Sequence, residues 1–351
     1  MTDKRGYAPL VQVWRGDTVE SVHFGAIAVA DSRGRVLAAC GDPGTITFLR
    51  SAAKPVQVLP LLASGAAERF GLLDEEIAVM AGSHGGEPFH VEAVRSILRK
   101  IGLDESALQC GVHAPYHRPT AQALRRRGAE PTALHNNCSG KHAGMLALAV
   151  HLGAPVSTYL EVDHPVQVRI RAAIEELAGL DPGSSRVATD GCSAPTFAMP
   201  LRHAARMYAR LVQEGRRGPM DAAAARVVAA MRRHPEMVAG TDRLCTKLMR
   251  AGGGGLIAKI GAEGYCGLGW RRDDAGVGAA LKIADGDGLR ARPSAAIEAL
   301  RQMGLLDRPV AAALVARFAP DLKNRRGLPV GRVEPVFDLG APPSRAAKAG
   351  A

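Results

Sequence analysis

The chain has 351 residues, of which 47% are hydrophobic and only 4% are aromatic, and its formal net charge at pH 7 is +11. No apolar run reaches the ~18 residues of a membrane-spanning helix, so we expect no membrane partner. The Lys and Arg residues are scattered among Asp and Glu and form no basic stripe with aromatic residues, so we expect no nucleic-acid partner either.

The six cysteines are dispersed along the chain and lack the spacing of a secreted disulfide scaffold. Met1–Gly6 leads into no apolar stretch of the kind found in signal peptides. We therefore expect a cytoplasmic protein that works in a reducing setting.

The first 50 residues predict an antiparallel meander, because they hold short apolar and β-branched runs separated by turn residues. The expected strands are Val11–Trp14, Val19–Val22, Phe24–Ala30 and Val36–Cys40. A helix is expected to begin at Ser51, and Pro60 should kink or shorten it because proline lacks a backbone N–H.

The middle of the chain predicts helices, because apolar residues recur there at intervals of three and four. The expected helices are His90–Ile101, Ser139–Leu152, Asp163–Ala178, Thr196–Gln213, Asp221–Arg233 and Thr241–Ala251. Asp163 and Thr241 are of the residue types that cap helix N-termini.

Four consecutive glycines, Gly252–Gly255, end this helical stretch. Strands are then expected at Leu256–Ile260, Tyr265–Trp270 and Gly278–Ile283, helices at Ser294–Met303 and Pro309–Phe318, and a closing strand at Pro335–Leu339. Strands at both ends with helices between them predict an α/β (α+β) fold, in which one sheet built from both termini flanks a helical region. We expect one domain over residues 1–339 and a disordered tail over 340–351.

Ser51 and Lys54 are three residues apart, which would bring a hydroxyl and an amine to one face of a helix. That arrangement suits a serine nucleophile with a lysine base. Taken alone, the spacing is common by chance and is more often that of a helix-capping Ser followed by an exposed Lys.

Three further segments combine glycines with polar side chains inside an Ala/Val/Leu-rich chain: 81–87, 135–142 and 189–192. Buried polar groups are costly unless they are paired, so such clusters point to a site. Cys138 and Cys192, one in each of the last two segments, would by themselves be either buried thiols or zinc ligands.

Together these segments resemble the L-asparaginase II family of rhizobial-type (class 3) L-asparaginases, over about Leu10 to about Leu339. The segments that carry the resemblance are Arg50-Ser51-Ala52-Ala53-Lys54-Pro55, Ala81-Gly82-Ser83-His84-Gly85-Gly86-Glu87, His135-Asn136-Asn137-Cys138-Ser139-Gly140-Lys141-His142, Thr189-Asp190-Gly191-Cys192 and Lys259-Ile260-Gly261-Ala262-Glu263-Gly264. The resemblance implies a fold similar to serine β-lactamases and glutaminases, hydrolysis of L-asparagine to L-aspartate and ammonia, and a homodimer.

The resemblance also implies two Ser–Lys pairs, Ser51 with Lys54 and Ser83 with Lys259, and we favour Ser51 over Ser83 as the nucleophile. It further implies one zinc ion per chain, bound by Cys138, Lys141 and Cys192. A water would occupy the fourth position, which is thus open to exchange.

Four more residues are candidates for binding the substrate. Arg50 suits the α-carboxylate because its guanidinium is a planar fork. Asp190 suits the substrate ammonium or the zinc-bound water. His84 and Glu87 are candidates either for substrate binding or for local hydrogen bonding.

Two other readings of function remain open. A glutaminase or another β-lactamase-like serine hydrolase would need a pocket that differs by as little as one methylene, a difference of only ~1–3 kcal/mol. A zinc- or thiol-dependent binding protein would rely on Cys138 and Cys192 and would not need Ser51.

Overall fold

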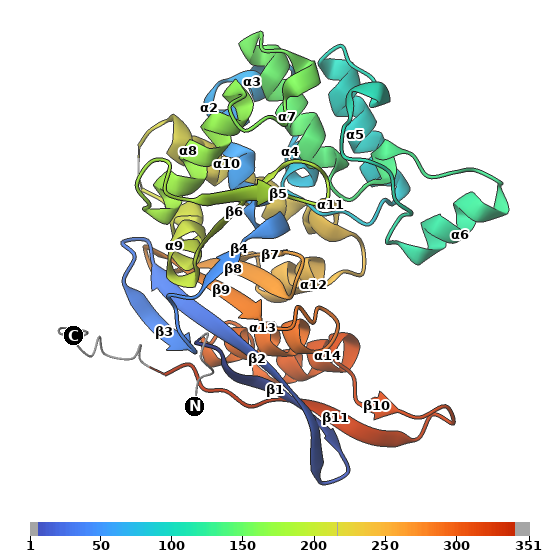
Figure 1. Cartoon of the computed structure of the whole chain (residues 1–351), viewed down its shortest axis with the longest axis vertical. Coiled ribbons are helices and arrows are strands. Elements are labelled where there is room, and N and C mark those ends of the chain that lie inside the picture. Colours follow the sequence, from blue (N-terminus) through green and yellow to red (C-terminus); the bar gives the residue numbers. More distant parts are fainter. Residues whose placement is uncertain (1–5, 216, 341–351) are drawn as a thin grey trace.

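An antiparallel sheet draws its strands from both ends of the chain. In the residues that the computed structural model describes, 6–215 and 217–340, the sheet has eight strands in the order β10-β11-β1-β2-β9-β8-β7, with β3 paired to the outer part of β2 (Figure 1). The strands are β1 (Ala8–Arg15), β2 (Thr18–Asp31), β3 (Val36–Cys40), β7 (Leu256–Ile260), β8 (Tyr265–Arg272), β9 (Ala275–Ile283), β10 (Leu322–Lys323) and β11 (Pro329–Pro335). The expected α/β fold class with a sheet assembled from both termini is confirmed.

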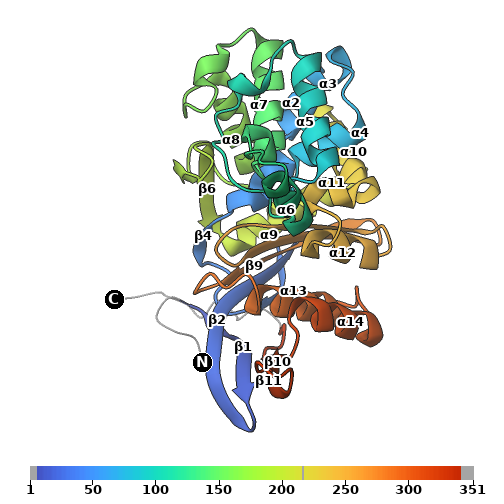
Figure 2. The same ribbon diagram turned by 90° about the vertical axis from the view of Figure 1, so that its right-hand side faces the viewer.

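Helices cover both faces of this sheet. Figures 1 and 2 show α9 (Leu201–Val212) on the face toward the helical region, and α13 (Ala291–Gln302) and α14 (Arg308–Phe318) on the other side. The central strands are therefore buried on both faces, which explains their nearly continuous apolar sequences. Gly278 on β9 lets α9 approach closely, because a Cβ there would lie 2.2 Å from the carbonyl oxygen of Ala205.

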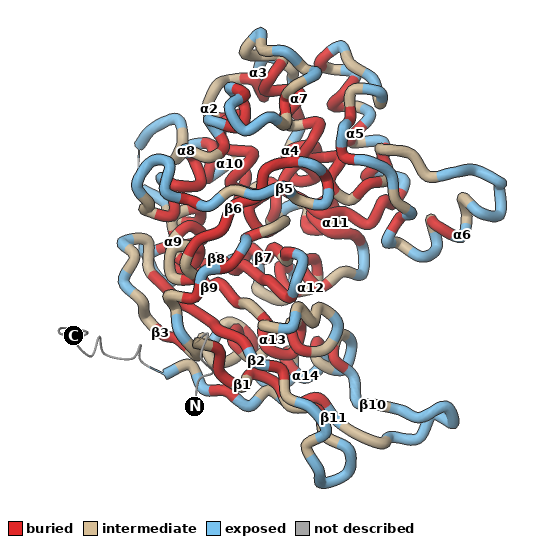
Figure 3. The backbone as a smooth tube through the Cα atoms, in the orientation of Figure 1, coloured by how far each residue is buried: buried red, intermediate tan, exposed pale blue. Residues whose placement is uncertain are grey.

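The helical region lies between the two halves of the sheet in sequence and next to the sheet in space. Its helices are α1 (Lys54–Gln57), α2 (Leu59–Ala63), α3 (Ala66–Arg69), α4 (Asp74–Met80), α5 (Pro88–Lys100), α6 (Arg118–Arg126), α7 (Ser139–Leu152), α8 (Pro165–Ala178), α10 (Pro219–Arg233), α11 (Pro235–Ala239) and α12 (Leu244–Ala251), with short 3₁₀ turns η1 (Arg50–Ala53), η2 (Glu105–Ala107), η3 (Ala133–His135) and η4 (Val156–Thr158). Buried residues extend from the sheet into these helices, so the two parts share one hydrophobic core (Figure 3).

Helix α7 lies in the interior of the helical region. Most of its residues are buried, on every side of the helix, and it packs against α4, α5 and α8. Such a helix is apolar or small all round rather than on one stripe. Three of its buried residues, Ser139, Lys141 and His142, are polar, so the helix carries polar groups into the core.

The prediction of a helix over Thr196–Gln213 is wrong in its first part. That part belongs to a second sheet, which has three strands in the order β4 (Ile46–Phe48), β6 (Pro195–Pro200) and β5 (Arg186–Thr189). The first part of that segment pairs with β4 and β5, and only α9 is helical. Helical spacing of apolar residues continues through β6, but pairing with two strands from elsewhere in the chain outweighs that local preference.

Other boundaries also differ from the predictions. The closing strand is β11, which ends at Pro335, where the expected strand Pro335–Leu339 begins; only one of its residues, Val333, is buried, so it has little apolar signal. Val19–Val22 and Phe24–Ala30 form one strand, β2, and the helix expected from Ser51 is divided into η1, α1 and α2. Helices α1 and α2 each have a proline in the first turn, Pro55 and Pro60. The helix is interrupted before Pro60, as expected.

The predicted caps are wrong as well. The His164 side chain, not Asp163, accepts from the N–H of Val166 at the start of α8, and α12 begins after Thr241, at Leu244. Of the predicted disordered tail, Gly340 pairs with Ala39, and the remainder lies outside the described residues. No helix in the described ranges combines the length and apolarity needed to cross a membrane.

Candidate active site

Two lysines from opposite parts of the fold converge on one serine hydroxyl. Lys54 begins α1, Lys259 lies on β7, and Ser83 lies in the loop after α4. The Nζ atoms of Lys54 and Lys259 are each 2.9 Å from Ser83 Oγ. The loop is held by the N–H of Ser83, which donates to the carbonyl oxygen of Val238 at 2.8 Å. The structure thus brings Ser83 into contact with both lysines that the sequence singled out.

Both lysines are almost completely buried, with 1% of each exposed. Burial lowers the pKa of Lys54 from its usual value, and it lowers the pKa of Lys259 to about 7. No carboxylate lies within ion-pair distance of either amine among the described residues. A lysine with a pKa near neutrality is partly unprotonated at pH 7 and can accept a proton.

Ser51 lies at the edge of this group and does not pair with Lys54. Its side chain is half-buried and its hydroxyl has no hydrogen-bond partner among the described residues. The Lys54 amine instead reaches Ser83 and the carbonyl oxygen of Asn137, at 3.2 Å. The Ser83–Lys259 contact is present, whereas a hydrogen bond between Ser51 and Lys54 is not.

Arg50 and Asp190 lie beside Ser51 and bind each other. The Nε and Nη2 atoms of Arg50 are 2.9 and 2.8 Å from Asp190 Oδ1, and the N–H of Gly191 donates to the same oxygen at 2.7 Å. Burial raises the pKa of Asp190, but the nearby Lys141 and Arg50 outweigh it and hold that pKa below its usual value. Arg50 also adopts a left-handed backbone, with φ of 50°, a conformation unusual for a non-glycine residue.

Cys138, Lys141 and Cys192 come together in the interior. The first two lie at the start of α7, and Cys192 lies in the turn between β5 and β6. Lys141 Nζ donates to Cys192 Sγ at 2.9 Å, and Cys138 Sγ lies 3.4 Å from Asn137 Oδ1. The neighbouring Cys192 thiol and the charges of Lys54 and Lys141 set the pKa of Cys138 well below its usual value.

The three atoms fit a zinc ion by their chemistry. Thiolate sulfur and nitrogen are the donors that zinc prefers, although an amine must lose a proton to bind. Burial lowers the pKa of Lys141, but the sulfurs of Cys138 and Cys192 raise it more, so a metal would have to displace that proton. The described residues contain no cluster of three or more His, Cys, Asp or Glu side chains suited to a metal, so such a site depends on the lysine.

His84 and Glu87 are fully engaged with the protein. His84 is buried, its Nε2 is 2.9 Å from Ser139 Oγ, and its Nδ1 accepts from the N–H of Gly86 at 3.2 Å. Burial also sets the pKa of His84 well below its usual value. The two carboxylate oxygens of Glu87 accept from the N–H and the hydroxyl of Thr241, at 2.9 and 2.7 Å. These contacts are those of residues that hold the Ser83 loop in place.

Asn137 is the contact that the motif-based reasoning missed. Its backbone carbonyl accepts from Lys54, and its side-chain oxygen lies 3.4 Å from Cys138 Sγ and 3.2 Å from His113 Nε2. Asn137 lies in the segment 135–142, but a contact through a backbone carbonyl does not depend on the residue type and so cannot be recognised in the sequence. Only its position beside Cys138 could have indicated it.

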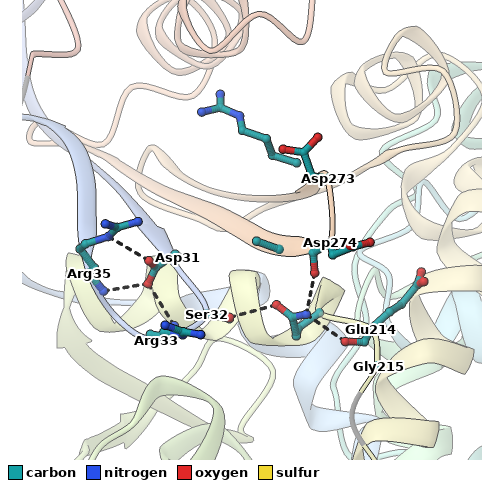
Figure 4. A pocket seen from close by; sticks show the side chains of 11 residues that line it. Asp31, Ser32, Arg33, Arg35, Glu214, Gly215, Asp273 and Asp274 are labelled. Atoms are coloured by element: carbon teal, nitrogen blue, oxygen red, sulfur yellow. Dashed lines mark hydrogen bonds and ion pairs between the residues drawn. The ribbon is translucent and has the colours of Figure 1, made fainter.

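A large cavity lies elsewhere. It has a volume of about 800 Å³ and is lined by the turns after β2, α9 and β8. Within its lining Asp31 forms an ion pair with Arg35 and accepts a hydrogen bond from the backbone N–H of Arg33 (Figure 4). The cavity shares no residue with the group around Ser83 and contains none of the predicted site residues.

Comparison with solved structures found glutaminase-like neighbours of low similarity. Mglu in its native form in the presence of 4.3 M NaCl is 17% identical, with a TM-score of 0.40 over 80% of this chain and 60% of that chain. A Bacillus glutaminase in 4.3 M NaCl is 13% identical, with a TM-score of 0.36 over 81% of this chain and 92% of that chain. The chain therefore spans about 60% of the length of Mglu.

No curated protein matches the chain. The sequence model of one family does match, that described as L-asparaginase II, and it covers residues 11–335. This span includes every one of the predicted site residues, from Arg50 to Lys259. The chain belongs to the L-asparaginase II family.

Proposed function

We propose that this protein is an L-asparaginase, an amidohydrolase that converts L-asparagine to L-aspartate and ammonia by a Ser–Lys mechanism. The observation that carries the proposal is the hydrogen-bonded group of Lys54, Ser83 and Lys259, with both lysines buried, in a member of the L-asparaginase II family. Amide hydrolysis needs a nucleophile, a base to accept its proton and an acid to protonate the departing nitrogen. Serines and neutral lysines can supply all three.

Ser51 is the proposed nucleophile and Ser83 the proposed proton relay. The Ser83 hydroxyl is committed to two lysines, which suits a group that passes a proton between them. The Ser51 hydroxyl has no partner in the described residues and keeps its lone pairs free for attack. In the first step Ser51 Oγ bonds to the amide carbon and its proton passes to Lys54. Ammonia leaves with a proton delivered through Ser83, and water then cleaves the ester to release aspartate.

Arg50 and Asp190 are the proposed contacts for the charged end of the substrate. Each is held by the other, so their mutual orientation is fixed before a ligand arrives. Free asparagine carries one carboxylate and one ammonium, which are complementary to a guanidinium and a carboxylate. An amino acid that binds there would exchange part of the existing ion pair for two new ones.

Zinc is proposed to bind Cys138, Lys141 and Cys192, with water completing the site. When bound it would supply a positive charge that polarises a carbonyl oxygen or orients a water. Lys54 links the two groups, because it donates to Ser83 Oγ and to the backbone carbonyl of Asn137, the residue that precedes Cys138.

Ammonia release and acyl-enzyme trapping test the mechanism. Wild type, Ser51→Ala, Ser83→Ala and the control Ser64→Ala are assayed with L-asparagine, L-glutamine and a β-lactam, and acid-quenched samples are analysed by intact-protein mass spectrometry. Ser64 is a half-buried serine that bonds only a backbone carbonyl, so its variant should keep full activity.

We expect ammonia mainly from L-asparagine, and less than roughly a tenth of wild-type turnover in Ser51→Ala. That variant should form no covalent adduct, whereas Ser83→Ala should form one slowly. An adduct in Ser51→Ala but not in Ser83→Ala would make Ser83 the nucleophile. Preference for L-glutamine or the β-lactam would replace the asparaginase assignment, and full activity of both serine variants would reject a serine mechanism.

A further inference from the structure

A second pocket, whose lining includes none of Lys54, Ser83 and Lys259, contains three arginines. It has a volume of about 290 Å³ and lies among α12, α13 and α14, which Figures 1 and 2 show next to one another. Arg243 immediately precedes α12, Arg292 lies on α13 and Arg317 on α14. The lining contains one carboxylate, that of Asp242, so the pocket has an excess of positive charge.

Asp242 does not neutralise this excess. Its carboxylate lies 3.0 Å from the amine of Lys247 and 3.1 Å from the guanidinium of Arg317, so two cations already share it. Within residues 6–215 and 217–340, no carboxylate lies within ion-pair distance of Arg243 or Arg292. The charge of Asp287 acts on Arg292, but the Asp287 carboxylate accepts from the backbone N–H groups of Arg290 and Ala291 at the start of α13.

Arg292 is fixed in position without being neutralised. Its Nη1 and Nη2 atoms donate to the carbonyl oxygens of Gly261 and Gly288, at 3.0 and 2.9 Å. Its Nε is buried and has no hydrogen-bond partner. Burial lowers the pKa of Arg292, and the neighbouring charge of Arg243 lowers it further. Neutral carbonyl oxygens satisfy donors but leave a full positive charge in a partly desolvated place.

Arg243 is fixed in a similar way. Its guanidinium lies over the ring of Tyr116, 5.6 Å from the ring centroid, a contact that orients a cation and leaves it charged. At the rim of the pocket, Leu289 is 81% exposed. The pocket thus joins two oriented, unneutralised guanidinium groups to a third at its edge.

We infer that this pocket binds a small oxyanion, such as a dicarboxylate or inorganic phosphate. Guanidinium forks match the paired oxygens of carboxylate and phosphate groups, and such bonds are strong because both partners are charged. An anion here would compensate the charges that the protein leaves open. The inference does not depend on the proposed function, since no lining residue is one of the proposed catalytic residues, although Ile260 at the pocket wall directly follows Lys259.

Isothermal titration calorimetry at pH 8 tests the inference, with sodium phosphate and sodium malonate as separate probes. Ionic strength is held constant because exposed charges are screened by salt. The variants are Arg292→Gln and Arg317→Glu. Arg317 is half-exposed, so its variant should fold even where Arg292→Gln does not. The matched control is Arg250→Gln, which removes an arginine of similar exposure from α12 but outside the pocket.

We expect wild type and Arg250→Gln to bind at least one of the two anions with the same affinity. Arg317→Glu should weaken that binding by about tenfold or more, and Arg292→Gln should abolish it. Binding of phosphate alone or of malonate alone would identify which source of oxyanion the pocket takes. Absence of binding to wild type would overturn the inference, as would equal affinity in wild type and Arg317→Glu.

Discussion

At the scale of single residues, the protonation of Lys259 should set how activity depends on pH. With a pKa of about 7 caused by burial, its amine is charged below that pH and neutral above it. A protonated lysine cannot accept a proton from Ser83, so kcat/KM for ammonia release should fall as pH decreases through about 7 and level off above it. A pH series at fixed ionic strength measures this profile.

A histidine that must be unprotonated would also make kcat/KM fall at a similar pH, so a control for this acid limb of the profile is needed. His84, the nearest candidate, has its pKa set well below the usual value by burial and should not titrate in this range. The limb should therefore persist in a His84→Gln variant that retains activity. A limb that vanishes in this variant, or one that lies near the ordinary lysine pKa of ~10.4, would contradict the role of Lys259.

Lys259 should also reduce the stability of the fold. Its pKa is lower in the folded than in the unfolded protein, so between pH ~7 and ~10.5 the unfolded state binds more protons and stability rises with pH. Lys259→Met removes this dependence. Urea unfolding should show the variant more stable than wild type at pH 7, by about 2 kcal/mol after allowing for the unpaired Ser83 hydroxyl, with a smaller difference at pH 10. Lys247→Met, at a surface ion pair, serves as control, and a gap that does not change with pH would refute the argument.

At the scale of elements, the packing of α9 on the sheet depends on small residues. A Cβ on Gly278 would lie 2.2 Å from a backbone oxygen of α9, which cannot rotate away as a side chain can. Gly278→Ala should therefore destabilise the protein by about 1–3 kcal/mol through overpacking. Gly255→Ala is the matched control, because the atom nearest to its Cβ is 3.6 Å away. Equal urea midpoints for the two variants would show that α9 can move without cost.

The same scale shows which elements could be predicted from the sequence. Strands β7 to β9 and helix α7 have long apolar runs, from which their secondary structure could be predicted. The short strand β6 does not, because its conformation is determined by β4 and β5, which reach it from elsewhere in the chain. β11 was also misplaced, since a strand with only one buried residue has little apolar pattern.

The residues of the candidate site and the contact between Ser83 and Lys259 were predicted, but the contact between Lys54 and Ser83 was not. Motifs named Ser83, Lys54 and Lys259, yet spacing along a helix pairs Lys54 with Ser51. The 3₁₀ turn that precedes α1 and the loop held by Val238 bring the amine to Ser83 instead. Contacts between residues so distant in sequence depend on the tertiary fold, which local patterns do not encode.

At the scale of the whole molecule, a bound zinc ion would join two regions. Cys138 directly precedes α7 and Lys141 lies on it, in the helical region, whereas Cys192 lies in the turn between β5 and β6. Elemental analysis after gel filtration should find about one zinc per chain. The Cys138→Ser/Cys192→Ser double variant should have none, and Cys110→Ser should keep it, because that buried thiol only donates to the carbonyl oxygen of Ala133. Zinc-free wild type, or a fully loaded double variant, would remove the site.

Assembly of the whole molecule is the remaining prediction at this scale. The family resemblance implies a homodimer, and light scattering on the gel-filtered protein measures the mass directly. A mass of one chain, 36.8 kDa, at the concentration used for the assay would contradict it.

The pairing of β2 with β9 has a consequence for the order in which the protein is made. The N-terminal strands leave the ribosome first but find their central neighbour only after residue 283 has emerged. Until then β2 has an unpaired edge, and Lys259 has no completed sheet to hold it. A nascent chain that ends before residue 283 would lack β9, and Lys259 would not be held against Ser83. Activity should therefore arise only near the end of translation.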